Sequence, residues 1–147
     1  MLGVTPYAGS NPALSAIFGL GKTITLQFHL YGIGNCSTVQ KALDWFESEG
    51  LQAHLHDYKE IGVDREVLQA AIAAHGWEKV LNRASYTWRG LNEDIKSQMD
   101  ETLAVETAIH SPSLIKRPMI VYNQNGEQHI LLGWRDKQKQ AVLSAGA

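Results

Sequence analysis

The chain has 147 residues, 44% of them hydrophobic and 19% charged, which is typical of one globular domain with an adequate core. Its net charge of −2 gives no whole-chain attraction to nucleic acid or acidic membranes, and no apolar run reaches the roughly 20 residues that span a bilayer. The single cysteine, Cys36, excludes an internal disulfide, so nothing in the sequence indicates an oxidising compartment. We expect a cytoplasmic protein and a monomer.

Residues 1–22 are rich in glycine, proline, serine and asparagine, and we predict a disordered N-terminal extension there. Its apolar patch, Ala13–Phe18, lacks the preceding basic residues of a secretory signal, although a weak targeting role stays an alternative. The folded domain is expected over residues 23–143.

The domain opens with a strand-helix-strand pattern. Apolar and polar residues alternate over Ile24–Tyr31, then recur at helical spacing from Val39 until Gly50, and alternate again over Leu51–Tyr58. This order predicts two parallel strands joined by a right-handed helical crossover.

A helical insertion is expected over about residues 62–111. Asp64 and Asn92 are suitable N-caps for two helices, and Trp77–Leu81 predicts one further helical turn. Ser85–Gly90 shows no period and is interpreted as a loop.

The C-terminal part predicts a hairpin and a final helix. Met119–Tyr122 and Gln128–Leu132 are short apolar strands around Asn125-Gly126, a strong signal for a type I′ turn, and Trp134–Leu143 is helical. The order β-α-β, helical insertion, β-β-α predicts an α/β protein with a mixed four-stranded sheet and thioredoxin-like topology.

Cys36 is the candidate nucleophile, because it falls where the first strand-to-helix loop opens into the helix. Unpaired N–H groups there favour an anion, and a thiol so placed commonly has a depressed pKa. Gly34, Asn35, Ser37 and Thr38 are candidate binding residues beside it. The alternative is that these neighbours only turn the chain and cap the helix, and that Cys36 is a small buried hydrophobe.

Without a second cysteine, any redox cycle of Cys36 needs an external thiol to resolve its oxidised form. Glutathione is the expected co-substrate, and its two carboxylates would need cations or backbone N–H groups. We expect no metal and no nucleotide cofactor.

Lys116-Arg117-Pro118 is the second candidate segment. Arg117 next to a proline that precedes a strand is suited to hold an oxyanion or a carboxylate near Cys36. Arg83 and Arg89, in the insertion, are possible further contributors. The alternative is a basic pair on a solvated loop.

Two other features carry less weight. His54 and His56 have a spacing that suits metal binding, but the sequence offers no third ligand, so a solvated or core-edge role is favoured. The four tryptophans are interpreted as packing residues, with Trp88 the best suited to line a cleft. Basic residues form no stripe with interleaved aromatics, so nucleic-acid binding is not expected.

Four segments in order resemble the arsenate-reductase-related (ArsC-like) family, with the YffB branch most similar, alongside the Spx regulators: residues 31–39, 56–58, 87–91 and 115–118. The resemblance spans about Ile24 to Lys137. It implies a thioredoxin-like fold with a helical insertion.

The resemblance also implies a nucleophilic thiol at Cys36. In arsenate reductases of the family, arginines bind the oxyanion, and glutathione with glutaredoxin completes turnover. Arg117 matches the arginine before the family proline, and Arg83 the insertion arginine. The third arginine is replaced by Leu131 or Leu132, which weakens an arsenate site.

Two further positions depart from the family patterns. Gln40, followed by Lys41, replaces the basic residue after the cysteine in arsenate reductases. Ile33 replaces the first cysteine of the Spx Cys-x-x-Cys switch. We therefore predict a glutathione-dependent thiol reductase with glutathione and glutaredoxin as partners. Arsenate reduction and an Spx-like RNA-polymerase-binding regulator are the alternatives.

Overall fold

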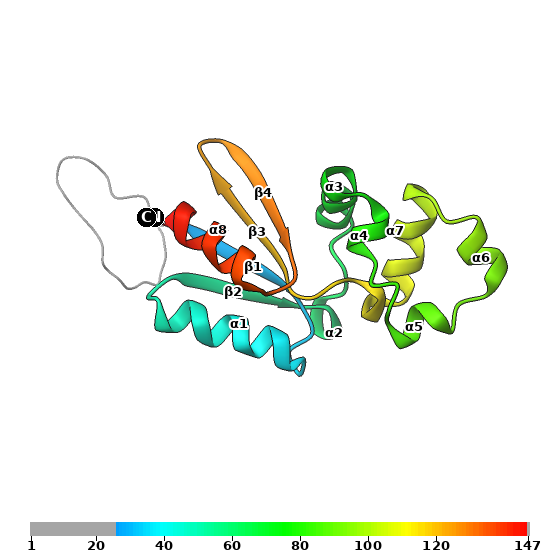
Figure 1. Ribbon diagram of the computed structural model, residues 1–147, viewed down its shortest axis with the longest axis horizontal. Helices are drawn as coiled ribbons and strands as arrows, with labels where there is room; N and C mark the ends of the chain where they lie inside the picture. Colours follow the sequence, from blue (N-terminus) through cyan, green and yellow to red (C-terminus); the bar gives the residue numbers. More distant parts are fainter. Residues whose placement is uncertain (1–25, 147) are drawn as a thin grey trace.

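The computed structural model describes residues 26–146 (Figure 1). The extension predicted over residues 1–22 lies outside the described residues. Within the part that is described, no helix is long and apolar enough to cross a membrane.

One mixed sheet forms the centre of the fold. Its strands are β1 (Gln27–Gly32), β2 (Gln52–Asp57), β3 (Met119–Gln124) and β4 (Glu127–Leu132), in the order β2-β1-β3-β4. β1 and β2 are parallel, whereas β3 is antiparallel to both β1 and β4. The predicted thioredoxin-like fold with a mixed four-stranded sheet is confirmed.

The first and last helices, α1 (Ser37–Ser48) and α8 (Asp136–Gly146), lie along the sheet (Figure 1). Alternate strand residues face them, and Phe28 packs on Phe46 of α1 with ring centroids 5.1 Å apart. Val142 of α8 is fully buried in the same core. The apolar stripe of α1 therefore fixes this helix on the sheet and, with it, the position of its first turn.

The other helices form the insertion between β2 and β3. They are α2 (Tyr58–Ile61), α3 (Arg65–His75), α4 (Trp77–Val80), α5 (Tyr86–Arg89), α6 (Glu93–Ser97), α7 (Glu101–His110) and the 3₁₀ turn η2 (Pro112–Leu114). Figure 1 shows α3 to α7 gathered beyond one end of the sheet. Buried residues of α3 and α7 share a core with Tyr31, Met119 and Val121, so the insertion is packed against that end.

The predicted caps are confirmed. The Asp64 side chain accepts a hydrogen bond from Val67 N at 3.1 Å, and the Asn92 side chain accepts one from Asp94 N at 2.7 Å. Each cap satisfies an N–H group that the first helical turn leaves free.

The loop predicted at Ser85–Gly90 is wrong, because one helical turn, α5, forms there. Ser85 Oγ caps it by accepting from Trp88 N at 3.1 Å. A single turn is too short to show a hydrophobic period, so only the serine could have indicated it. The predicted hairpin turn is confirmed, with φ of 55° at Asn125 and 80° at Gly126.

Histidines from two strands meet on the sheet face opposite α1. His29 Nδ1 lies 3.0 Å from His56 Nε2, and the Tyr31 ring stacks on His56 at 4.5 Å. Burial lowers the pKa of His29, and the neighbouring His56 and His54 lower it further. Burial and His54 also lower the pKa of His56, whereas the Asp64 carboxylate raises it. In residues 26–146, no group of three or more His, Cys, Asp or Glu side chains is placed to hold a metal ion.

We expect the protein to lose stability in mild acid. Because folding lowers the pKa of His29 and His56, the unfolded chain binds protons first as the pH falls below its value of about 6.5. The free energy of unfolding is therefore unaffected by these histidines above about pH 6.5. It decreases as the pH falls from there through the lower pKa values that His29 and His56 have in the folded protein. Urea unfolding between about pH 8 and 5 should show this slope, and His29→Gln/His56→Gln should flatten it. An unchanged slope in the double variant would contradict the assignment.

Candidate active site

One row of paired residues across the sheet brings the candidate segments together. Tyr31 of β1 pairs with Met119 of β3, and Met119 pairs with Leu132 of β4. β1 ends one residue beyond this row, β4 ends in it, and β3 begins in it. The loop that leads to Cys36, the Lys116-Arg117-Pro118 segment and the turn after β4 therefore lie at the same edge of the sheet.

Cys36 is the N-cap residue of α1, with φ −80° and ψ 126°. Its backbone N–H donates to Ile33 O and its carbonyl accepts from Gln40 N, both at 3.0 Å. The half-buried thiol is a free cysteine, and no side chain caps this helix. The sulfur therefore lies at a helix start whose N–H groups favour an anion, as predicted.

The loop before Cys36 is clamped through the peptide groups of Gly34. Gly34 N donates to Asp57 Oδ2 at 2.9 Å, and Gln40 Nε2 donates to Gly34 O at 2.6 Å. Asp57 Oδ1 also accepts from Lys59 N at 2.8 Å, which fixes the carboxylate at the end of β2. Gln40, the replacement for a family basic residue, thus stabilises the loop.

Gly32 and Gly34 lie so close to neighbouring side chains that there is no room for a Cβ atom. A Cβ on Gly34 would lie 2.7 Å from Asp57 Oδ2, and one on Gly32 would lie 2.9 Å from Val39 Cγ2 and 3.7 Å from Arg117 Cγ. The absence of side chains lets the loop pack against the Arg117 stem and the Asp57 carboxylate.

A pocket of about 510 Å³ opens beside this loop. Its charged residues are all cations: Lys116, Arg117 and Arg135. The other lining residues are polar or apolar: Thr38, Asn82, Leu132, Gly133, Trp134 and Gln138. An anionic ligand with several polar groups suits this lining.

Arg135 is a site residue that sequence reasoning missed. Gly133, with φ of 84°, turns the chain away from β4, and its N–H donates to Pro118 O at 2.9 Å. Gln138 then fixes the turn by accepting from Arg135 N at 2.9 Å and donating to Leu132 O at 2.8 Å. The family resemblance places the third arginine on the strand itself, whereas this cation follows the strand end by three residues.

The structure brings together only some of the predicted site residues. Thr38, Lys116 and Arg117 line the pocket, and the Arg117–Pro118 peptide bond is cis. Four others are outside the lining: Gly34, Asn35, Ser37 and Pro118, of which Asn35 and Ser37 are exposed. Cys36 is not part of the lining either, but it precedes Thr38 by two residues in the chain.

Arg83 and Trp88 also lie outside the pocket lining. The Arg83 guanidinium carbon is 5.9 Å from the centroid of the Trp77 ring, and Trp77 and Trp88 stack at 6.1 Å. Trp134, not Trp88, is the tryptophan that lines the pocket. Trp88 does not line this pocket; its ring stacks on Trp77 within the insertion.

Tyr58 is buried next to the site at the start of α2. Burial raises the pKa of its hydroxyl, Tyr31 raises it further, and Arg117 opposes the shift. The hydroxyl has no hydrogen-bond partner among the described residues. Tyr58 therefore stays neutral and adds no negative charge beside Arg117.

The fold and the site define an α/β protein of thioredoxin-like topology with a free thiol at a strand-to-helix junction. The sequence model of the ArsC family matches residues 31–142, and the chain belongs to this family. A protein of Haemophilus influenzae is 40% identical over 115 residues, which cover 78% of this chain and 97% of the relative.

Two solved structures are also similar. One, named YFFB (PA3664) protein, is 40% identical with a TM-score of 0.70, and the match covers 82% of this chain and 99% of that one. The other, an arsenate reductase (ArsC) related protein from Brucella melitensis, is 37% identical with a TM-score of 0.60, covering 85% and 98%. These matches agree with the YffB branch that the sequence motifs indicate.

We expect Gly34→Ala to destabilise the protein by about 1–3 kcal/mol, because the new Cβ would displace Asp57 and break a hydrogen bond to a carboxylate. Gly90→Ala is the matched control, since Gly90 has φ −83° and its Cβ would meet nothing closer than 3.6 Å. Urea unfolding of both variants measures the difference. Equal stabilities would show that the clamp does not hold the loop.

Proposed function

We propose that the protein is a glutathione-dependent thiol reductase in which Cys36 is the single nucleophile. The observation that carries this proposal is a half-buried thiol at the start of α1, next to a pocket whose charged residues are all cations. The thiol is free and lies at the junction of the loop and the helix, and the pocket beside it suits an anionic thiol that can resolve the oxidised enzyme.

Glutathione suits the pocket in size and charge. A volume of about 510 Å³ falls within the range of about 300–1,000 Å³ for small-molecule sites. The two carboxylates of glutathione match Lys116, Arg117 and Arg135, and its amide carbonyls match the side-chain NH₂ group of Asn82, since the Gln138 amide is taken up by the turn after β4. Its thiol would then approach the loop that carries Cys36.

The proposed cycle has two exchange steps for a thiolated substrate, R–S–S–G. The Cys36 thiolate attacks the glutathionyl sulfur, so that a Cys36–glutathione disulfide forms and R–S⁻ leaves and takes up a proton. A glutathione thiolate then attacks that disulfide, oxidised glutathione forms, and the Cys36 thiolate is released. In sum, the substrate gains two electrons and two glutathione units end as one disulfide. Glutaredoxin is an alternative resolving partner.

Arsenate reduction is the second candidate, and Arg135 is the observation that favours it. Leu131 or Leu132 replaces the third family arginine, but Arg135 returns a third cation to the pocket beside Lys116 and Arg117. Three cations suit a tetrahedral oxyanion as well as a pair of carboxylates.

We expect wild-type protein to reduce a glutathionylated peptide with glutathione, and Cys36→Ser to lose this turnover entirely, because no other thiol exists in the chain. The same assay with arsenate, glutathione and glutaredoxin separates the two candidates. Turnover of the peptide alone supports the thiol reductase. Turnover of arsenate alone, or of neither substrate, would contradict it.

We expect Arg135→Gln to weaken binding of reduced glutathione about tenfold, because a hydrogen bond to a charged group contributes about 1.5–3 kcal/mol. Lys137→Gln is the matched control. Lys137 is two residues after Arg135 and carries the same charge, but its side chain does not line the pocket. NMR titration gives both affinities, and shifts should include Thr38, Lys116 and Arg117. Equal losses in the two variants would argue against a specific contact.

A further inference from the structure

Among the exposed cations outside the pocket are three that come from different parts of the chain. Lys41 is on α1, Arg83 follows α4 and Arg89 ends α5. Among the described residues only two ion pairs form, Arg65–Glu106 and Lys96–Glu93, so none of these three cations has a carboxylate partner. Their charges are therefore free to meet an anionic group from another molecule.

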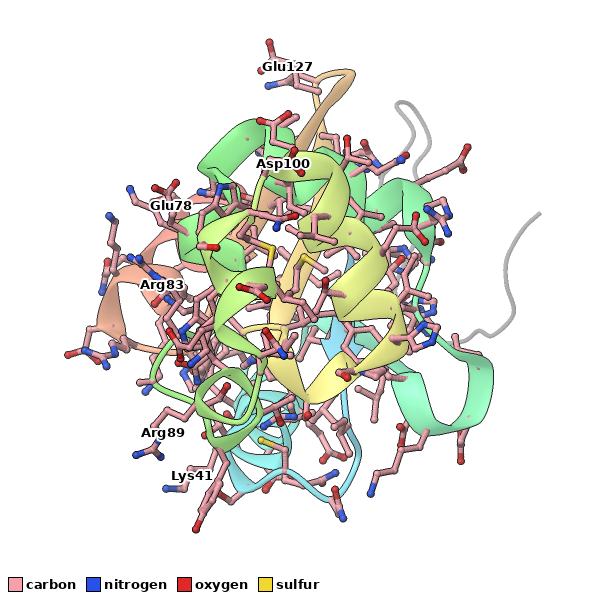
Figure 2. The ribbon with its side chains drawn as sticks, turned by 90° about the vertical axis from the view of Figure 1, so that its right-hand side faces the viewer. Lys41, Glu78, Arg83, Arg89, Asp100 and Glu127 are labelled. Carbon is pink, nitrogen blue, oxygen red and sulfur yellow. The ribbon has the colours of Figure 1, made fainter. Side chains whose placement is uncertain are left out.

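These cations lie on one side of the molecule. Figure 2 shows Lys41, Arg89, Arg83 and Glu78 one above another along the same side, so that three cations and one carboxylate share it, whereas Asp100 and Glu127 lie at the top of the view. Lys41 is five residues after Cys36, which corresponds to a rise of about 7 Å along α1. We call Lys41, Arg83, Arg89 and the neighbouring Tyr86 the basic surface.

The basic surface also carries an exposed aromatic ring. The Tyr86 side chain is 88% exposed, and the Arg89 guanidinium carbon lies 5.3 Å from its ring centroid. Arg83 is held in a similar way over Trp77, at 5.9 Å. Stacking limits the freedom of both guanidinium groups, which reduces the entropy lost when they bind. Exposed Tyr and Arg together are the residue types that most often dominate protein–protein contacts.

From this arrangement we infer that the basic surface docks an acidic polypeptide, and that the disulfide which Cys36 attacks belongs to a cysteine flanked by aspartate or glutamate. This inference rests on the proposed function and names its substrate class. The chemistry is the exchange already given, with R–S–S–G as a glutathionylated acidic protein: the Cys36–glutathione disulfide forms, and the protein thiolate leaves.

A polypeptide explains the surface better than the other anions do. A small anion is served by the cations that line the pocket, whereas the basic surface lies outside the pocket and extends over several elements. A nucleic acid matches the charge, but it carries no sulfur for Cys36 to attack. Only a protein supplies both an extended acidic surface and a disulfide.

The test uses three peptides of equal length, each with one glutathionylated cysteine flanked by glutamates, glutamines or lysines. Deglutathionylation rates of the full chain are measured with glutathione present. We expect the glutamate peptide to react about tenfold faster than the glutamine peptide at about 20 mM salt, with the ratio near one at about 0.5 M. Equal rates for all three peptides overturn the inference and leave the proposed function intact. No reaction with any peptide or with hydroxyethyl disulfide overturns both.

Charge variants locate the effect. Lys41→Gln and Arg89→Gln should each lower the rate for the glutamate peptide about threefold at low salt and leave the rate for the glutamine peptide unchanged. Arg65→Gln is the matched control, because it removes the same charge from a side chain already paired with Glu106. An equal loss in Arg65→Gln would overturn the assignment to this surface. A competition experiment gives a second test, in which a thiol-free glutamate peptide and an oligouridylate of the same charge are compared as inhibitors. Stronger inhibition by the oligouridylate would also overturn the assignment.

Discussion

The site depends on a single register between three strands. Tyr31, Met119 and Leu132 form one paired row across β1, β3 and β4, and the chain leaves the sheet next to this row at three points. Because side chains alternate between faces, a slip of one residue would turn each strand over and move its loop. The buried aromatic and aliphatic residues that face α1 and α8 therefore set the position of the thiol relative to the cations.

The register alone would leave the loop before Cys36 free to move. Asp57 and Gln40 remove this freedom by holding the N–H and the carbonyl of Gly34. Both contacts come from elements that the core already fixes, the end of β2 and the first turn of α1. The result is a preorganised loop, which lets the helix start act on the sulfur without any reordering when a substrate arrives.

Much of this fold could be predicted from the sequence, because its long elements have clear periods and its caps and hairpin turn use diagnostic residues. Asp64, Asn92 and Asn125-Gly126 act locally, so their roles are visible without the structure. α5 could not be found by its period, since it has only one turn. The Asp57 clamp and the meeting of His29 with His56 join residues far apart in sequence, and only the strand register brings them together. Arg135 was missed for the same reason: its position depends on the turn after β4.

A monothiol cycle has a particular requirement that this arrangement meets. In the proposed cycle, with no second cysteine, the Cys36–glutathione disulfide must persist until another thiol arrives, so the site would receive two anionic reactants one after the other. The described chain separates them, with Lys116, Arg117 and Arg135 around the pocket and Lys41, Arg83 and Arg89 exposed outside it. A protein docked on the outer cations can then leave the inner cations open, and the whole chain needs no positive net charge to attract either reactant.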